Sequence, residues 1–273
     1  MSTALQVFVD GRPCSESWPQ DRALQYGDGL FETMLVRNGR IRFEALHRAR
    51  LAQGCNRLAI TADHAAIWRQ ARQLASGLGA ALLKLQLTRG DATTRGYAPS
   101  GVERTRVILS VYPAPTAADL PATVRAVTLR NSLGENPDLA GLKHCNRLEQ
   151  VLARASLQGT DAFEGLMASS SGLLISGTMS NVFVELDGLL VTPELDLCGI
   201  AGVLRAVVLR EAQQAALSVR IARIPMSALE RCTSLAVSNV RLGLLSVHEL
   251  NGRKLGLQSS LRELAARIDL LDE

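Results

Sequence analysis

The spacing of apolar and polar residues divides the first half of the chain into alternating strands and helices. It predicts helices over residues 45–57 and 63–78, and strands over 5–9, 30–36, 40–43, 81–88 and 105–111. Asn38-Gly39 lies between two of these strands. Both residues adopt positive φ readily, so this pair predicts a tight hairpin.

The second half alternates in the same way. It predicts strands over residues 123–129, 164–168, 181–186, 189–192 and 235–238, and helices over 202–217 and 257–269. A further helix is expected to begin near Asn146-Arg147-Leu148-Glu149, which resembles a capping box, and to end near Gly159. One face of it would hold Leu148, Val151, Leu152 and Ala155.

A proline-rich segment separates the two halves. Pro113, Pro115 and Pro121 block both helix formation and sheet pairing. We therefore predict two domains of α/β (α+β) type, an N-terminal domain over 1–113 and a C-terminal domain over 123–273, joined by a linker over 114–122.

Composition narrows the class of protein. Of 273 residues, 47% are hydrophobic and 21% charged, which is typical of a globular protein with a buried core. The net charge of +4 is dispersed and aromatic residues are only 4%, which disfavours nucleic-acid binding. The chain shows neither a signal peptide nor an apolar run of the ~20 residues that span a membrane. Five cysteines without a CxxC pair and four histidines without ligand spacing predict no disulfide framework, no metal site and a cytoplasmic location.

Several residues are candidates for chemistry. Lys143 precedes a predicted helix in an apolar stretch, where loss of hydration would make its amine a nucleophile, although a surface lysine is the more common case. Gly199–Arg205 opens a helix whose N–H groups could bind phosphate, and the turn at Ser238–Arg241 could add more. Arg95 could pair with a carboxylate. None of these segments is decisive singly, because a surface lysine, a solvated loop arginine, an ordinary glycine-rich loop and a strand end are common features.

The order of the motifs resembles one family. Gln25–Thr33, His47–Leu51, Gly141–Gln150, Ser180–Phe183 and Gly202–Arg205 together are similar to the class IV aminotransferases. Lys143-His144-Cys145-Asn146-Arg147-Leu148-Glu149 and Arg95-Gly96-Tyr97 resemble the aminodeoxychorismate lyase branch of that family.

The resemblance implies a fold type IV enzyme with pyridoxal 5′-phosphate (PLP) between two domains, acting as a homodimer. It implies conversion of 4-amino-4-deoxychorismate to 4-aminobenzoate and pyruvate in folate synthesis. The alternatives are a D-amino-acid or branched-chain aminotransferase, a PLP-binding relative without turnover, and an α/β domain without cofactor.

By the same resemblance, Lys143 would bind PLP covalently and move the substrate's α-proton. The cofactor phosphate would be bound by Arg50 and by the backbone around Val203, Leu204, Asn239 and Val240. The substrate would be bound by Tyr26, Phe31, Arg95 and Tyr97. Which of Asp28, Glu32 and Thr33 assists proton transfer is left open.

The sequence departs from the family at one position. Family members have a glutamate opposite the pyridine nitrogen, and Ser176 stands there instead. A hydroxyl can donate to a neutral nitrogen but cannot stabilise a protonated one by charge. We therefore expect Ser176 to suit an elimination, which aromatisation of the product drives, and to handicap transamination. The opposing interpretation is a weakened or repurposed enzyme.

Overall fold

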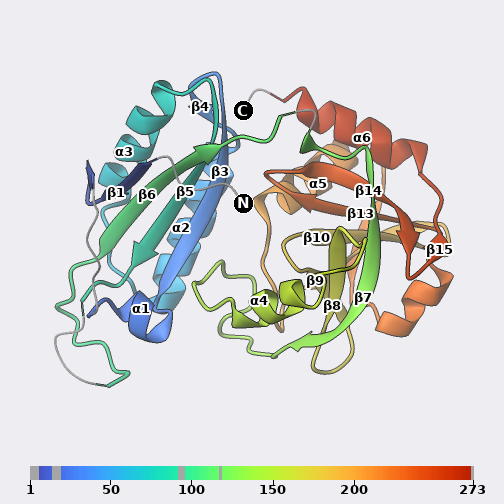
Figure 1. Ribbon diagram of the computed structural model, residues 1–273, viewed down its shortest axis with the longest axis horizontal. Helices are drawn as coiled ribbons and strands as arrows, with labels where there is room; N and C mark the ends of the chain where they lie inside the picture. The colour runs from blue at the N-terminus through green and yellow to red at the C-terminus, as the bar shows by residue number, and fades with distance from the viewer. Residues whose placement is uncertain (1–5, 14–19, 92–95, 117–118, 272–273) are drawn as a thin grey trace. The chain divides into compact units, whose positions relative to one another are not determined.

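The computed structural model describes residues 6–13, 20–91, 96–116 and 119–271, and the chain forms two compact units (Figure 1). The first unit holds the chain up to Thr116 together with Leu142–Asn146. The second holds Ala117–Gly141 and the chain from Arg147. The segment 142–146 therefore leaves the C-terminal part of the sequence to join the N-terminal unit.

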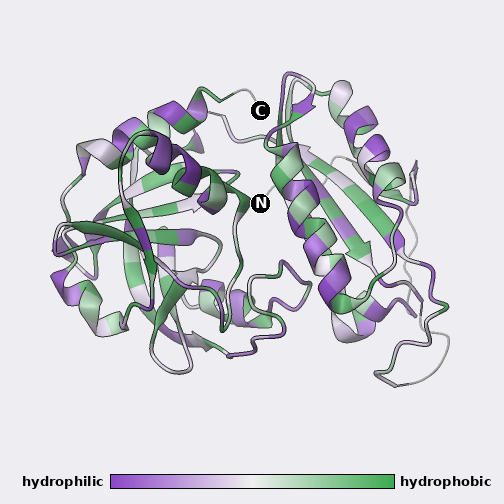
Figure 2. Ribbon diagram, turned by 180° about the vertical axis from the view of Figure 1, so that it is seen from behind, coloured by the Kyte–Doolittle hydropathy of each residue, from purple (hydrophilic) through white to green (hydrophobic). Residues whose placement is uncertain are grey.

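The first unit is built on an antiparallel sheet of order β2-β1-β6-β5-β3-β4. Its strands are β1 (Gln6–Val9), β2 (Arg12–Pro13), β3 (Gly29–Arg37), β4 (Arg40–Ile41), β5 (Ala80–Thr88) and β6 (Arg106–Pro113). The helices α2 (Glu44–Leu58) and α3 (His64–Ser76) lie over one face (Figure 2). Leu51 and Trp68 of these helices share a core with Met34 and Leu83 of the strands. A short helix, α1 (Arg22–Tyr26), precedes β3.

The second unit contains a larger mixed sheet of order β12-β11-β10-β13-β14-β7-β8-β9, with β15 beside β14. Its strands are β7 (Thr123–Leu133), β8 (Glu164–Ser169), β9 (Leu174–Gly177), β10 (Asn181–Leu186), β11 (Leu189–Pro193), β12 (Val219–Ala222), β13 (Ser234–Asn239), β14 (Gly243–Leu250) and β15 (Arg253–Lys254). The helices are α4 (Leu148–Ala155), α5 (Val203–Gln214) and α6 (Ser259–Asp269), with a 3-10 turn, η2, at Met226–Arg231. Both units mix helix and sheet, as predicted.

Local signals predicted many elements correctly. The Asn38-Gly39 hairpin is confirmed, with φ of 51° and 74° at its two residues. The strands β9, β12 and β14 and the helix α1 were not predicted. No helix among the described residues is long and apolar enough to cross a membrane.

The expected capping box at α4 is wrong. Arg147 is the N-cap residue and its side chain makes no capping bond. Asn146 instead donates from Nδ2 to the carbonyl of Gly27 at 3.2 Å, and Glu149 accepts from the Gly134 N–H at 2.7 Å. These two side chains therefore tie the ends of the segment to other parts of the chain.

Candidate functional site

Lys143 lies on an extended segment that pairs with the first half of β3. The Phe31 N–H donates to the Lys143 carbonyl at 2.9 Å, and the Cys145 N–H donates to the Gly29 carbonyl at 2.9 Å. The Lys143 Nζ atom lies 4.2 Å from the centre of the Phe31 ring. Backbone pairing therefore fixes the base of a half-buried lysine beside an aromatic ring.

The buried face of β3 holds a carboxylate among apolar side chains. Leu30, Glu32 and Met34 alternate toward the core, and a buried carboxylate requires partners. The partners of Glu32 come from α2. Arg50 donates from Nε at 2.8 Å and also from Nη2, and the His47 Nδ1 lies 2.6 Å from the carboxylate. Glu32 thereby fixes the direction of the Arg50 guanidinium.

The charge states of this cluster follow from burial and geometry. Burial alone would raise the pKa of Glu32, but the charge of Arg50 and the hydrogen bonds from His47 and Arg50 lower that pKa to about 2. Burial lowers the pKa of His47, although Glu32 opposes the change, so the imidazole is neutral at neutral pH. A carboxylate can only accept, so the His47 proton resides on Nδ1 and donates to Glu32.

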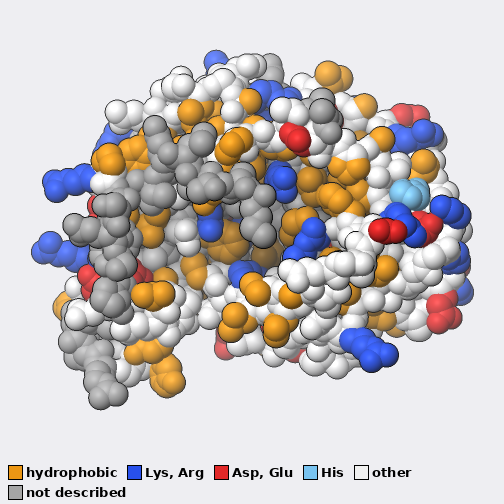
Figure 3. Space-filling view, in the orientation of Figure 1, with side chains coloured by type: hydrophobic (Ala, Val, Ile, Leu, Met, Phe, Trp, Pro, Cys, Tyr) orange, Lys and Arg blue, Asp and Glu red, His pale blue; other side chains and the backbone are white. Residues whose placement is uncertain are grey.

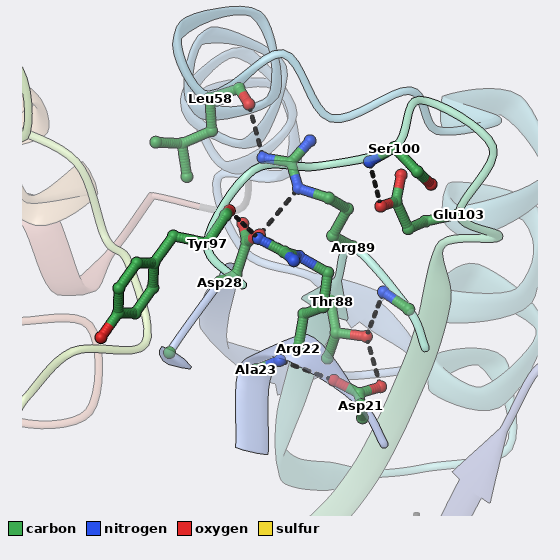
Figure 4. A network of polar contacts seen from close by, with 12 residues as sticks. Asp21, Arg22, Ala23, Asp28, Leu58, Thr88, Arg89, Tyr97, Ser100 and Glu103 are labelled. Carbon is green, nitrogen blue, oxygen red and sulfur yellow. Dashed lines mark hydrogen bonds and ion pairs between the residues drawn. The ribbon is translucent and has the colours of Figure 1, made fainter. Parts of the chain in front are cut away.

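A second group of predicted residues lies on α1 and the β5–β6 loop. The rings of Tyr26 and Tyr97 meet edge to face with centroids 5.3 Å apart. The Arg22 guanidinium lies 5.0 Å from the Tyr26 ring. It also donates to the Tyr97 carbonyl at 2.6 Å, as Figure 4 shows. Arg95, predicted to bind the substrate carboxylates, lies outside the described residues. The structure thus brings two of the predicted substrate residues together.

In the second unit, the start of α5 has the features of helix N-termini that bind anions, and we call it the α5 cradle. Gly202 is the N-cap residue and provides no side-chain cap, and the first N–H groups of the helix belong to Val203 and Leu204. Asn181 donates from Nδ2 to the Ile200 carbonyl at 2.9 Å. A Cβ atom at Gly202 would lie 2.0 Å from the Asn181 Oδ1 atom, so a larger residue there would have to displace the Asn181 side chain.

The turn after β13 supports the same region of the second unit. Asn239 accepts from the N–H groups of Arg241 and Leu242 at 3.0 and 2.9 Å, which shapes the backbone around Val240. Its Nδ2 donates to the Met179 carbonyl at 3.1 Å, next to the Asn181 loop. Asn181 also pairs in register with Ser238, whose buried hydroxyl has no partner among the described residues. A polar cradle with an unpaired hydroxyl fits a phosphate group.

Ser176 lies at the same end of this unit. It is buried on β9, opposite Met167 of β8. The adjoining loop is held by Glu164, which accepts from the Thr178 N–H at 2.9 Å and the Ser180 hydroxyl at 2.7 Å. The Glu164 carboxylate is therefore committed to shaping this loop.

Each unit, taken by itself, contains groups of the kind that bind PLP. The first unit offers an amine at Lys143 and an oriented guanidinium at Arg50, and the second offers helix N–H groups at Val203 and Leu204. The sequence interpretation did not identify the role of Glu32. A signal was present, because Glu32 is an acid at an inward-facing position of an otherwise apolar strand and a buried acid requires partners. The interpretation also did not assign Arg22 or Glu164.

The fold and these residues define a class of protein. A sequence profile for amino-transferase class IV matches residues 29–250, and the chain belongs to this family of PLP-dependent enzymes.

Individual relatives narrow the comparison. The aminodeoxychorismate lyase of Vibrio harveyi is 32% identical over 96% of this chain and 97% of its own length. The crystal structure of 4-amino-4-deoxychorismate lyase from Pseudomonas aeruginosa is 40% identical, covers 98% of this chain and 100% of its own, and superposes with a TM-score of 0.92. The PLP-bound form of a hypothetical aminotransferase from Mycobacterium tuberculosis, with 23% identity and a TM-score of 0.79 over 97% of each chain, shares the fold.

Proposed function

We propose that this chain is an aminodeoxychorismate lyase, which converts 4-amino-4-deoxychorismate to 4-aminobenzoate and pyruvate in folate synthesis. The observation that carries this proposal is the likeness to the Pseudomonas aeruginosa lyase, which extends over 98% of the chain at 40% identity. The placement of Lys143 beside Phe31 supports it, because this is the lysine of the lyase-like motif.

The proposed roles follow from the chemistry of the side chains. Lys143 would hold PLP covalently and, once the amine of the substrate has taken its place, its freed amine would move the proton of the substrate carbon that bears that amine. When bound, PLP withdraws electrons from that carbon. Arg50, held by Glu32, and the N–H groups at Val203 and Leu204 bind the phosphate.

The remaining site residues have binding roles in this proposal. Val240 and Asn239 complete the phosphate cradle through their turn. Tyr26, Phe31, Arg95 and Tyr97 bind the substrate. The carboxylates of Asp28 and Glu32 are already paired with arginines, so neither is proposed as the group that moves the proton.

Ser176 separates elimination from transamination in this proposal. A hydroxyl supports a neutral pyridine nitrogen, so electron withdrawal is weaker than with a carboxylate. Aromatisation of the product ring compensates in the elimination, but transamination has no such driving force. A second activity is still to be tested, because the bifunctional aminodeoxychorismate lyase / D-amino acid transaminase of Mycobacterium tuberculosis is 30% identical over 67% of this chain.

We also propose that the enzyme is a homodimer in the cytoplasm. Hydrophobic side chains gather over α4 (Figure 3), where Leu148, Val151 and Leu152 are exposed by 76%, 57% and 62%. An apolar helix face of this kind is typical of a protein interface. The cysteines among the described residues are free thiols, which fits a reducing compartment.

The test combines product analysis with the state of Lys143. PLP-loaded protein is mixed with enzymatically generated aminodeoxychorismate, and 4-aminobenzoate and pyruvate are measured together. We expect equal amounts of both, and none from Lys143→Ala. Borohydride reduction followed by peptide mass spectrometry is expected to find PLP on Lys143. A protein that binds PLP there but releases neither product would refute the lyase, and a panel of amino acids would then test transamination.

A further inference from the structure

A buried arginine that the proposed chemistry does not use joins α1 to the β5–β6 loop. The side chain of Arg22 is only 4% exposed. Its Nε donates to Asp28 at 2.8 Å, its Nη2 to the Tyr97 carbonyl at 2.6 Å and its Nη1 to the Gly96 carbonyl at 3.4 Å. In Figure 4 the Arg22 guanidinium lies between Asp28 and the backbone of Tyr97.

The network continues from Asp28 to the end of α2. Arg89 donates from Nε to the same Asp28 oxygen at 2.8 Å, and its other nitrogens donate to the carbonyls of Leu58 and Ala59 at 2.7 and 2.8 Å. Those carbonyls are the negative end of the helix dipole. Burial would raise the pKa of Asp28, but Arg89 and Arg22 outweigh burial and lower it, so the carboxylate stays charged between the two guanidinium groups.

Tyr97 is 83% exposed. Among the described residues, the edge of the Tyr26 ring contacts its ring and Arg22 donates a hydrogen bond to its carbonyl. The Arg22 guanidinium also lies against the Tyr26 ring at 5.0 Å. One side chain therefore contacts both tyrosines.

We propose that Arg22 is a positioning residue for substrate binding, which holds Tyr26 and Tyr97 in one arrangement and couples their loop to α2 through Asp28 and Arg89. The link between Arg22 and substrate binding rests on the proposed function. Arginine is required rather than lysine, because the planar fork donates to a carboxylate and to two carbonyls at once, whereas an ammonium group is a single point charge.

The experiment compares Arg22→Ala, Arg22→Lys and a control, Arg72→Ala, in the PLP-loaded protein. Arg72 is an exposed arginine of the same unit, on α3, and it pairs with Glu44 of α2. In Arg22→Ala, Asp28 keeps Arg89 as its partner. We expect KM for aminodeoxychorismate to rise about tenfold or more with a smaller change in kcat, as for the loss of one charge-assisted hydrogen bond. Arg22→Lys should recover only part of this loss, and Arg72→Ala should not change KM.

A second measurement separates this proposal from the proposed function. Hydrogen exchange of the peptide over residues 96–103 should accelerate in Arg22→Ala and stay unchanged in Arg72→Ala, while the strands β3 and β5 keep their protection. Unchanged exchange, or a fall in kcat with KM intact, would overturn the positioning role. If the wild type releases no product, the lyase assignment fails, and the exchange measurement alone then decides whether Arg22 holds the Tyr97 loop: unchanged exchange in Arg22→Ala would overturn the proposal.

Discussion

The Glu32 carboxylate makes a quantitative prediction about stability. In Glu32→Gln the side chain keeps its shape but loses the negative charge to which Arg50 donates. The Glu32 pKa falls from its ordinary value of 4.5 to about 2 in the folded protein. One pKa unit corresponds to about 1.4 kcal/mol, so the charged form contributes about 3 kcal/mol to the free energy of unfolding at neutral pH.

The pH dependence has a definite sign. A depressed acid pKa means that this stabilisation is fully present above the unfolded-state pKa, near 4.5, and is lost as the pH falls through about 2. Wild type and Glu32→Gln should therefore differ by about 3 kcal/mol at neutral pH, and the difference should shrink steadily below about pH 4.

Urea unfolding of the PLP-free protein measures this difference, with the fluorescence of buried Trp68 as a probe in the same unit. With a slope of about 1–3 kcal/mol per molar urea, the midpoint should move by about 1 M or more. Glu103→Gln is the matched control. Backbone N–H groups, first that of Ser100, also lower the pKa of Glu103 to about 2. This carboxylate lies in a solvent-accessible loop, where solvent screening leaves little stabilisation, so the urea midpoint of Glu103→Gln should stay close to that of wild type. Equal midpoints for wild type and Glu32→Gln at neutral pH, or a gap that persists in acid, would refute the reasoning.

Three other substitutions test separate parts of the structure. Gly202→Ala places a methyl group against the Asn181 side chain, so PLP affinity should fall at least tenfold in a fluorescence titration. Circular dichroism should show that the fold is retained. Unchanged affinity would exclude the start of α5 as the phosphate-binding site. Ser176→Glu should raise transamination of simple amino acids, measured as 2-oxo acid release, and no gain would contradict the role given to the serine hydroxyl. Leu152→Lys should shift the proposed dimer toward monomer in analytical ultracentrifugation, whereas Arg154→Lys, on the same helix, should not.

The sequence predicted elements whose signals are local. The hairpin at Asn38-Gly39 follows from two residues that tolerate positive φ, and the helix around His47 and Arg50 follows from its periodicity. The strand β9 was missed because it is short and lies in a glycine- and serine-rich stretch. The apolar face of α4 was recognised, but the pattern alone does not say whether that face is buried or exposed.

The sequence indicated candidate site residues but not how the chain brings them together. Motif order selected Lys143, Arg50, Tyr26 and Tyr97, yet it could not predict that residues 142–146 pair with β3, because that pairing is non-local. The Arg22 and Asp28 network was also missed. Arg89, the partner of Asp28, and Tyr97, the partner of Arg22, each lie more than 60 residues further along the chain, and no periodicity connects them.

The route of the chain through its two units has a consequence for biosynthesis. The chain passes between the units after Thr116, enters the first unit again at Leu142 and leaves it after Asn146. During translation, the edge of β3 therefore stays without its partner segment until about thirty residues beyond Thr116 have left the ribosome. An unpaired strand edge invites pairing with another chain, so the nascent N-terminal unit is exposed to misassembly over this interval. The segment that completes the pairing of β3 also carries Lys143, so synthesis finishes this part of the sheet and places Lys143 beside Phe31 in the same step.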